Sequence, residues 1–208
     1  MNYKYYDIIE DIKPKSWLSG YHKTTISYLI KMAFFYYAIG VILQIIGNYI
    51  AQYAISGYIG PSLPYSILIG LTSGPVEETL FFGLPYYLSG NSYLVLATGV
   101  AWSIGHIFNT EVLQITNLAF GKFLFTVPHI FFSLRTWKSG KGWFAIVFHS
   151  VWNVTFLSSH CIISGNSCIL IGNGWYFLAD VISIIAAILL IVATYRLYKR
   201  KPIGISKE

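Results

Sequence analysis

The last apolar run of the chain is long enough to cross a lipid bilayer. Residues 178–195 read LADVISIIAAILLIVATY, with one charged side chain among them, and three aromatic residues precede the run. Crossing a hydrocarbon layer of about 30 Å takes about 20 mostly apolar residues in a helix. A helix that is apolar on every side has to be buried in protein or in lipid. We therefore predict an all-α integral membrane protein.

Five earlier segments have the same character, which predicts a bundle of about six transmembrane helices. Only 11% of the 208 residues are charged, against about 25% in a typical soluble domain. We expect a single polytopic membrane domain over 1–208, with a short interfacial helix in the N-terminal segment 1–30 and the catalytic core helices in 64–158. The six predicted spans are 31–55, 64–88, 92–108, 112–134, 143–158 and 175–198.

The placement of the basic residues explains the net charge of +6 without a nucleic-acid partner. Apart from Lys31 and Lys122, every Lys and Arg falls in the N-terminal tail, the 135–142 loop or the tail from residue 196. Basic residues of short loops stay on the cytoplasmic side. We therefore predict a multi-pass protein of the cell membrane with both termini in the cytoplasm and the lipid bilayer as its partner.

Several polar side chains fall at membrane depth in these spans. A charged group there costs about 2.5–3.5 kcal/mol on insertion scales and usually faces the interior of the bundle, where it marks function. Counting residues from the helix ends at about 1.5 Å each puts most of these groups at overlapping depths. One shared cavity is physically reasonable. The residues are Glu77, Glu78, His106, Lys122, His129, His149 and Asn153.

These groups suffice for peptide hydrolysis. A carboxylate and an imidazole that share a water molecule can remove its proton. An amide and an imidazole can donate hydrogen bonds to a tetrahedral oxyanion. His149 and Asn153 stand at i and i+4, so they project from one face of their helix. Ser73 and Ser103 lie near these groups, but nothing in the sequence marks either as an activated nucleophile.

Three short motifs in these spans resemble those of the CPBP family of CAAX proteases and bacteriocin-processing enzymes, also called the Abi family. "EETLFFG" at 77–83 resembles the first motif, which is two Glu, three variable residues and an Arg. "WSIGH" at 102–106 resembles the second, an aromatic residue followed four later by His. "HSVWN" at 149–153 resembles the third, His followed four later by Asn.

The resemblance implies an intramembrane endopeptidase for a membrane-bound peptide or protein, with a prenylated CAAX-type protein and a leader peptide as two options. It implies that Glu77 and His106 activate water, that His149 and Asn153 stabilise the oxyanion, and that Glu78 supports the site. Many members are labelled metalloproteases. For a zinc enzyme the implied ligands are Glu77, His106 and His149, and a catalytic zinc with three protein ligands and a water is chemically acceptable.

The chain departs from the first motif at one position. The motif Arg falls on Phe82, so Glu78 needs another partner. Our hypothesis is that Lys122, at a similar depth, is the counter-ion of Glu78 or Glu77. For His129, which follows Pro128, we expect a structural bond to a freed backbone carbonyl.

Two other functions remain open from the sequence. One is a catalytically inactive membrane scaffold or immunity protein, which the missing Arg favours. The other is a small transporter or proton relay, because buried Glu, Lys and His also serve in those proteins. A transporter often carries internal repeats, and none is visible here.

Overall fold

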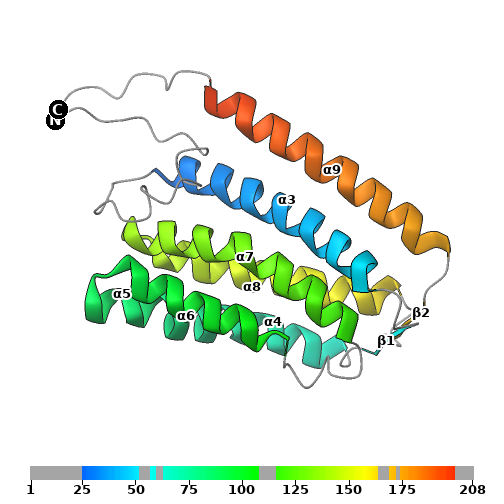
Figure 1. Ribbon diagram of the computed structural model, residues 1–208, viewed down its shortest axis with the longest axis horizontal. Coiled ribbons are helices and arrows are strands. Elements are labelled where there is room, and N and C mark those ends of the chain that lie inside the picture. Colours follow the sequence, from blue (N-terminus) through cyan, green and yellow to red (C-terminus); the bar gives the residue numbers. More distant parts are fainter. Residues whose placement is uncertain are drawn as a thin grey trace.

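The computed structural model describes residues 25–51, 57–59, 63–107, 116–163, 169–171 and 174–199. Within these ranges the chain is almost entirely helical (Figure 1), which confirms the all-α class. The predicted interfacial helix in 1–30 lies outside the described residues up to residue 24. The helices are α3 (Ile26–Ala51), α4 (Leu63–Glu78), the π-helix η2 (Thr79–Gly83), α5 (Leu84–Ser89), α6 (Ser92–Gly105), α7 (Thr116–Lys138), α8 (Gly142–Ile163) and α9 (Gly174–Lys199).

Each predicted span falls on one of these helices or, for 64–88, on the run from α4 through η2 to α5. Two stretches of the described chain are long and apolar enough to cross a membrane, Ile26–Gly47 and Ile67–Ser89. Two shorter helical stretches, Ser92–Gly105 and Val181–Arg196, are also apolar. The number of spans stays a prediction.

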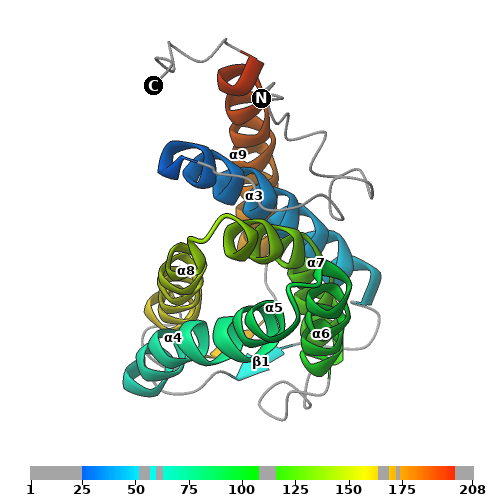
Figure 2. The same ribbon diagram turned by 90° about the vertical axis from the view of Figure 1, so that its left-hand side faces the viewer.

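The helices form a bundle in which α7 is central (Figure 2). On one side α7 packs against α3, which in turn packs against α9, and on the other side it contacts α6 and α8. Helix α8 packs along α4. The sequence did not predict the two short strands β1 (Gly57–Ile59) and β2 (Ile169–Ile171), which pair antiparallel with Tyr58 opposite Leu170.

The chain runs back and forth between the two ends of the bundle. The start of α3, the α5–α6 turn, the α7–α8 turn and the end of α9 lie at one end, while the β1–β2 pair lies at the other (Figure 1). The α5–α6 turn is closed by Gly90, whose φ is 61°, and by Asn91, whose side chain accepts from the amide of Tyr93 at 2.8 Å. A left-handed residue of this kind is best served by Gly.

Much of the outer surface is apolar. Leu80, Leu84, Tyr87, Leu88 and Tyr93 are all exposed, with Leu88 at 78%. Soluble monomers rarely expose contiguous apolar patches larger than a few hundred Å². The surface therefore suits a lipid environment, in agreement with the membrane location expected from the sequence.

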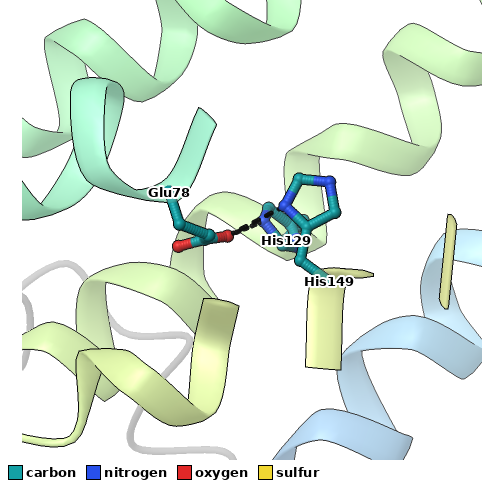
Figure 3. Close-up of side chains that lie close together, drawn as sticks. All are labelled: Glu78, His129 and His149. Carbon is teal, nitrogen blue, oxygen red and sulfur yellow. Dashed lines mark hydrogen bonds and ion pairs between the residues drawn. The ribbon is translucent and has the colours of Figure 1, made fainter. Parts of the chain in front are cut away.

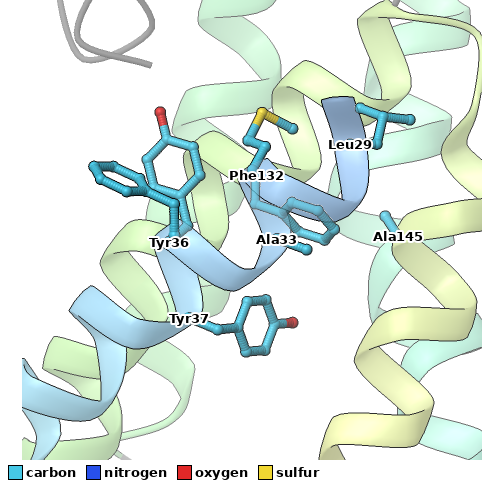
Figure 4. Close-up of a cluster of buried hydrophobic side chains, with 8 residues drawn as sticks. Leu29, Ala33, Tyr36, Tyr37, Phe132 and Ala145 are labelled. Atoms are coloured by element: carbon cyan, nitrogen blue, oxygen red, sulfur yellow. The ribbon is translucent and has the colours of Figure 1, made fainter. Parts of the chain in front are cut away.

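The interior has two apolar clusters, one on each side of α7. The first joins α3, α7 and α8, and its labelled members in Figure 4 are Leu29, Ala33, Tyr36, Tyr37, Phe132 and Ala145. The second surrounds Phe82 and Trp102 and includes Ile130 and Trp137 of α7. Polar residues of α7 lie between these clusters, which keeps water from their hydrogen bonds.

Glycines of α4 allow α8 to approach closely. A Cβ placed on Gly70 would lie 2.6 Å from the backbone nitrogen of Val154, and one on Gly74 would lie 2.7 Å from the carbonyl oxygen of Ile146. Small residues at a helix interface in a membrane let two backbones come together in this way. The close approach brings the end of α4, with Glu77 and Glu78, alongside the part of α8 that carries His149.

Two prolines interrupt the hydrogen bonding of α4 and α5, and a hydroxyl from another helix compensates each. Pro75 has no N–H for the carbonyl of Leu71, four residues earlier, and Ser150 of α8 donates to that oxygen at 3.3 Å. Pro85 likewise has no N–H for the carbonyl of Phe81, which accepts from Thr98 of α6 at 2.5 Å. Freed carbonyls at membrane depth require such partners.

Candidate active site

The candidate residues come from four helices that meet around the end of α4. Glu77 and Glu78 are the last two residues of α4, directly before the π-helix η2. Single π-turns of this kind are frequent at functional sites. His106 caps the end of α6, His129 lies in α7, and His149 lies in α8.

One carboxylate oxygen of Glu77 faces two imidazoles. Its Oε2 lies 3.9 Å from Nε2 of His106 and 3.7 Å from Nε2 of His149. These separations are too long for direct hydrogen bonds. Trp102 donates its indole N–H to the same oxygen at 2.6 Å, and the Glu77 side chain keeps 26% of its surface exposed. The carboxylate is thus held in place yet accessible.

His106 has a defined tautomer. Its Nδ1 lies 2.9 Å from the carbonyl oxygen of Trp102, which can only accept, so Nδ1 carries the hydrogen. In the neutral ring, Nε2 then presents a lone pair toward Glu77. Two acceptors that face each other at 3.9 Å need a donor between them. A water molecule is the natural donor, because it offers one hydrogen to each.

Glu78 is completely buried and receives four donors. Its Oε1 lies 2.5 Å from Nε2 of His129, 2.8 Å from the hydroxyl of Ser133 and 3.2 Å from Nδ1 of His149. Its Oε2 accepts from the indole N–H of Trp137 at 3.1 Å. Figure 3 shows the carboxylate directed at the two imidazoles. Hydrogen bonds of this number satisfy a buried carboxylate without a neighbouring Arg or Lys.

The carbonyl bond expected for His129 was wrong. Its Nδ1 lies 2.7 Å from the hydroxyl of Tyr37 and its Nε2 bonds Glu78, so it does not serve a carbonyl freed by Pro128. Sequence reasoning also missed Ser133 and Trp137. A signal for them exists, because His129, Ser133 and Trp137 stand at i, i+4 and i+8 on one face of α7.

Asn153 lies one turn further along α8 than His149. Its Nδ2 donates to the hydroxyl of Ser73 at 2.7 Å. Ser73 precedes Glu77 by four residues, so Ser73 and Glu77 share one face of α4. His149 and Asn153 of α8 therefore face Ser73 and Glu77 of α4. The amide of Asn153 lies at the same interface as Glu77. The catalytic roles of these residues stay predictions.

Phe82, at the position of the motif Arg, is fully buried. Its ring packs edge-on against Trp102 and His129, with centroids 5.5 and 5.9 Å apart. The donors around Glu78 come from α7 and α8 side chains. Lys122 lies seven residues before His129 on α7, and its part as a counter-ion stays a hypothesis.

The described residues bring together one group that could hold a metal ion, and it differs from the set expected. Ligand atoms of Glu78, His129 and His149 lie within 4.8 Å of one another. All three side chains are buried, at 0%, 2% and 4% exposure. A catalytic zinc keeps one position open to water, so this group does not fit one.

The set of zinc ligands that the resemblance implied is slightly wider than bound zinc would require, so zinc binding by this set stays a prediction. Tetrahedral ligands at about 2.0–2.1 Å from zinc stand about 3.3 Å apart, whereas Oε2 of Glu77 lies 3.9 and 3.7 Å from the two imidazole nitrogens. Trp102 donates to that oxygen, a bond that a metal-bound carboxylate can keep.

Residues 59–155 match a family model described as type II CAAX prenyl endopeptidase Rce1-like. This segment belongs to the Rce1-like family. The match agrees with the resemblance of the three motifs, all of which it contains, and it overlaps the predicted core helices 64–158. The Rce1-like segment includes Glu77, Glu78, His106, His129, His149 and Asn153, whereas Tyr37 precedes it. No curated protein and no solved structure shows significant similarity to the chain.

Proposed function

We propose that the chain is an intramembrane endopeptidase in which Glu77 and His106 activate a water molecule for attack on a peptide bond. The observation that carries the proposal is the spacing around Glu77. Two imidazole nitrogens lie 3.9 and 3.7 Å from one partly exposed carboxylate oxygen. That distance leaves no direct bond between them, and it suits one shared water.

The protons can be followed through the first step. The water donates one hydrogen to Oε2 of Glu77 and the other to Nε2 of His106, whose Nδ1–H is already bonded to a carbonyl. As the oxygen attacks the substrate carbonyl carbon, Glu77 takes one proton and later delivers it to the leaving amine. General base catalysis of this kind contributes about 10²–10⁴-fold.

We propose that His149 and Asn153 stabilise the oxyanion that forms. The Asn153 amide has two N–H groups, of which one bonds Ser73 and the other is left for the substrate. His149 directs Nδ1 at Glu78 and Nε2 at Glu77. In its imidazolium form, His149 donates from both nitrogens, and the buried carboxylate of Glu78 balances its charge.

The surroundings of Glu78 support an active enzyme over an inactive scaffold. Loss of the motif Arg would leave a buried carboxylate unpaired, at a cost of several kcal/mol. Here three α7 side chains and His149 supply the hydrogen bonds. The departure at Phe82 is therefore compensated within the site, and the polar cluster of the motifs is kept.

The family description supports a prenylated CAAX-type protein as the substrate. A prenyl chain partitions into lipid, so an intramembrane site is a suitable place for its cleavage. We further propose a multi-pass arrangement with both termini in the cytoplasm. Arg135 and Lys138, in the last turn of α7, lie at the bundle end where α3 starts and α9 finishes (Figure 1). Reporter domains fused to each terminus should both stay inaccessible from outside intact cells.

The test is cleavage of a quenched prenylated CAAX peptide, beside a leader-type peptide, by the full-length protein in detergent. The isosteric Glu77→Gln variant should lose about 10²–10⁴-fold in kcat, while the control Thr72→Val should match wild type, because Thr72 bonds only its own helix. Equal rates for wild type and Glu77→Gln would refute the proposal. Loss with a chelator and recovery with zinc would refute the metal-free mechanism alone.

A further inference from the structure

Four helices are connected by one run of hydrogen bonds that ends at the candidate active site. The Tyr37 hydroxyl of α3 meets Nδ1 of His129, and Nε2 of His129 meets Oε1 of Glu78. The same oxygen meets Nδ1 of His149, whose Nε2 faces Glu77. Tyr37, His129, Glu78 and His149 are each at most 4% exposed, so water does not compete for these bonds.

With Glu78 ionised and His129 neutral, one arrangement of hydrogens satisfies the whole run. The carboxylate accepts from both imidazoles, so His129 carries hydrogen at Nε2 and His149 carries hydrogen at Nδ1. A neutral His129 then has its lone pair at Nδ1, which accepts from the hydroxyl of Tyr37. Each group then makes the bond that its neighbour needs, which fixes the tautomer of His129 and puts a hydrogen on Nδ1 of His149, whether that ring is neutral or an imidazolium.

We propose that His129, held by Tyr37, is the positioning residue that fixes Glu78 and thereby the orientation of His149 beside Glu77. The assignment rests on the proposed function. His129 would then be the partner of Glu78, as a cation at position 82 would otherwise be. Position 82 is one turn after Glu78, and the centroids of the Phe82 and His129 rings are 5.9 Å apart. It also makes α3, which precedes the matched segment, part of the site.

The experiment compares catalysis and melting temperature for variants of this run in the full-length protein. Tyr37→Phe removes one hydroxyl and should lower kcat about 3–10-fold, the worth of one hydrogen bond, with KM unchanged. His129→Leu should lower kcat more than Tyr37→Phe does, because it removes a donor of a buried carboxylate. His129→Gln retains an N–H donor and should recover part of that loss. A purely structural role would not give this order.

Two double variants test whether another residue can replace His129 as the partner of Glu78, and whether the effect of His129 depends on Glu78. In the His129→Ser background, Phe82→Arg should restore melting temperature and kcat toward wild type, since the guanidinium would reach Glu78. In the Glu78→Gln background, His129→Leu should lower the melting temperature less than it does in the wild type. The control Thr72→Val should change neither quantity.

The two readouts separate this proposal from the proposed function. If the wild type cleaves no peptide, the melting temperatures alone decide, and coupling between Glu78 and His129 would still support the positioning. A folded His129→Leu variant with wild-type kcat would overturn it. Phe82→Arg that fails to raise either readout in the His129→Ser background would also overturn it.

Discussion

Replacing Gly74 by alanine tests whether the close approach of α4 and α8 sets the geometry at Glu77. An alanine Cβ would lie 2.7 Å from the carbonyl oxygen of Ile146 and 2.8 Å from the backbone nitrogen of Ser150. Unstrained heavy-atom contacts begin at about 3.5 Å, so the helices must separate by about 0.8 Å. The Cβ would also meet the hydroxyl oxygen of Ser150, which can rotate away, whereas the two backbone atoms of α8 cannot. Gly74 precedes Glu77 by three residues, so the separation reaches the site.

The expected magnitudes follow from that displacement. Overpacking costs about 1–3 kcal/mol, and the better helix propensity of alanine returns at most about 1 kcal/mol, so Gly74→Ala should be destabilised by about 1–2 kcal/mol. A misplacement of about 1 Å can cost about 10²-fold in rate, so we expect kcat to fall about tenfold or more. Thermal melting in detergent and steady-state cleavage of the prenylated peptide measure the two effects.

Gly105→Ala is the matched control. Gly105 is also helical, and a Cβ placed on it meets nothing within 4 Å. Only the propensity gain should act there, so the melting temperature should stay equal or rise and cleavage should match the wild type. If Gly74→Ala behaves like Gly105→Ala in both assays, the close packing of α4 on α8 does not position Glu77.

Three further substitutions have defined outcomes. Trp102→Phe removes the N–H donor of Glu77, a bond to a charged group worth about 1.5–3 kcal/mol, so kcat should fall at least about tenfold; unchanged kinetics would contradict this role. Asn153→Ala removes an oxyanion donor and should lower kcat about 10²–10³-fold with little change in KM; a rise in KM alone would instead indicate substrate binding. Gly90→Ala forces a side chain into the left-handed region and should cost about 1–2 kcal/mol, with a lower melting temperature but normal cleavage; equal melting would show that the turn relaxes.

The sequence was sufficient to predict the helices and three residues that meet. Apolar runs set the helix positions, because a membrane span needs a minimum length of apolar side chains. Counting residues from the turns put Glu77, His106 and His149 at overlapping depths, and the structure places both imidazoles within 4 Å of one Glu77 oxygen. The depth of a residue in a bundle depends mainly on its position along its own helix.

The partners of Glu78 could not be predicted in the same way. They depend on how each helix is rotated about its axis and on which helices are neighbours, and residue counting gives neither. The hypothesis for Lys122 came from its charge and its depth, whereas the donors that surround Glu78 include the neutral hydroxyl of Ser133 and the indole of Trp137. Tyr37 was not considered, because nothing in the sequence shows that α3 lies beside α7.

The two hydroxyls that serve proline-freed carbonyls have a consequence for how such chains vary over evolution. Ser150 is needed by Leu71 only while Pro75 is present, and Thr98 is needed by Phe81 only while Pro85 is present. Loss of either hydroxyl alone would leave a carbonyl without a partner in the membrane, whereas loss of the proline makes the hydroxyl dispensable. Each proline and its hydroxyl should therefore covary among relatives, and the order of loss should run from the proline to the hydroxyl.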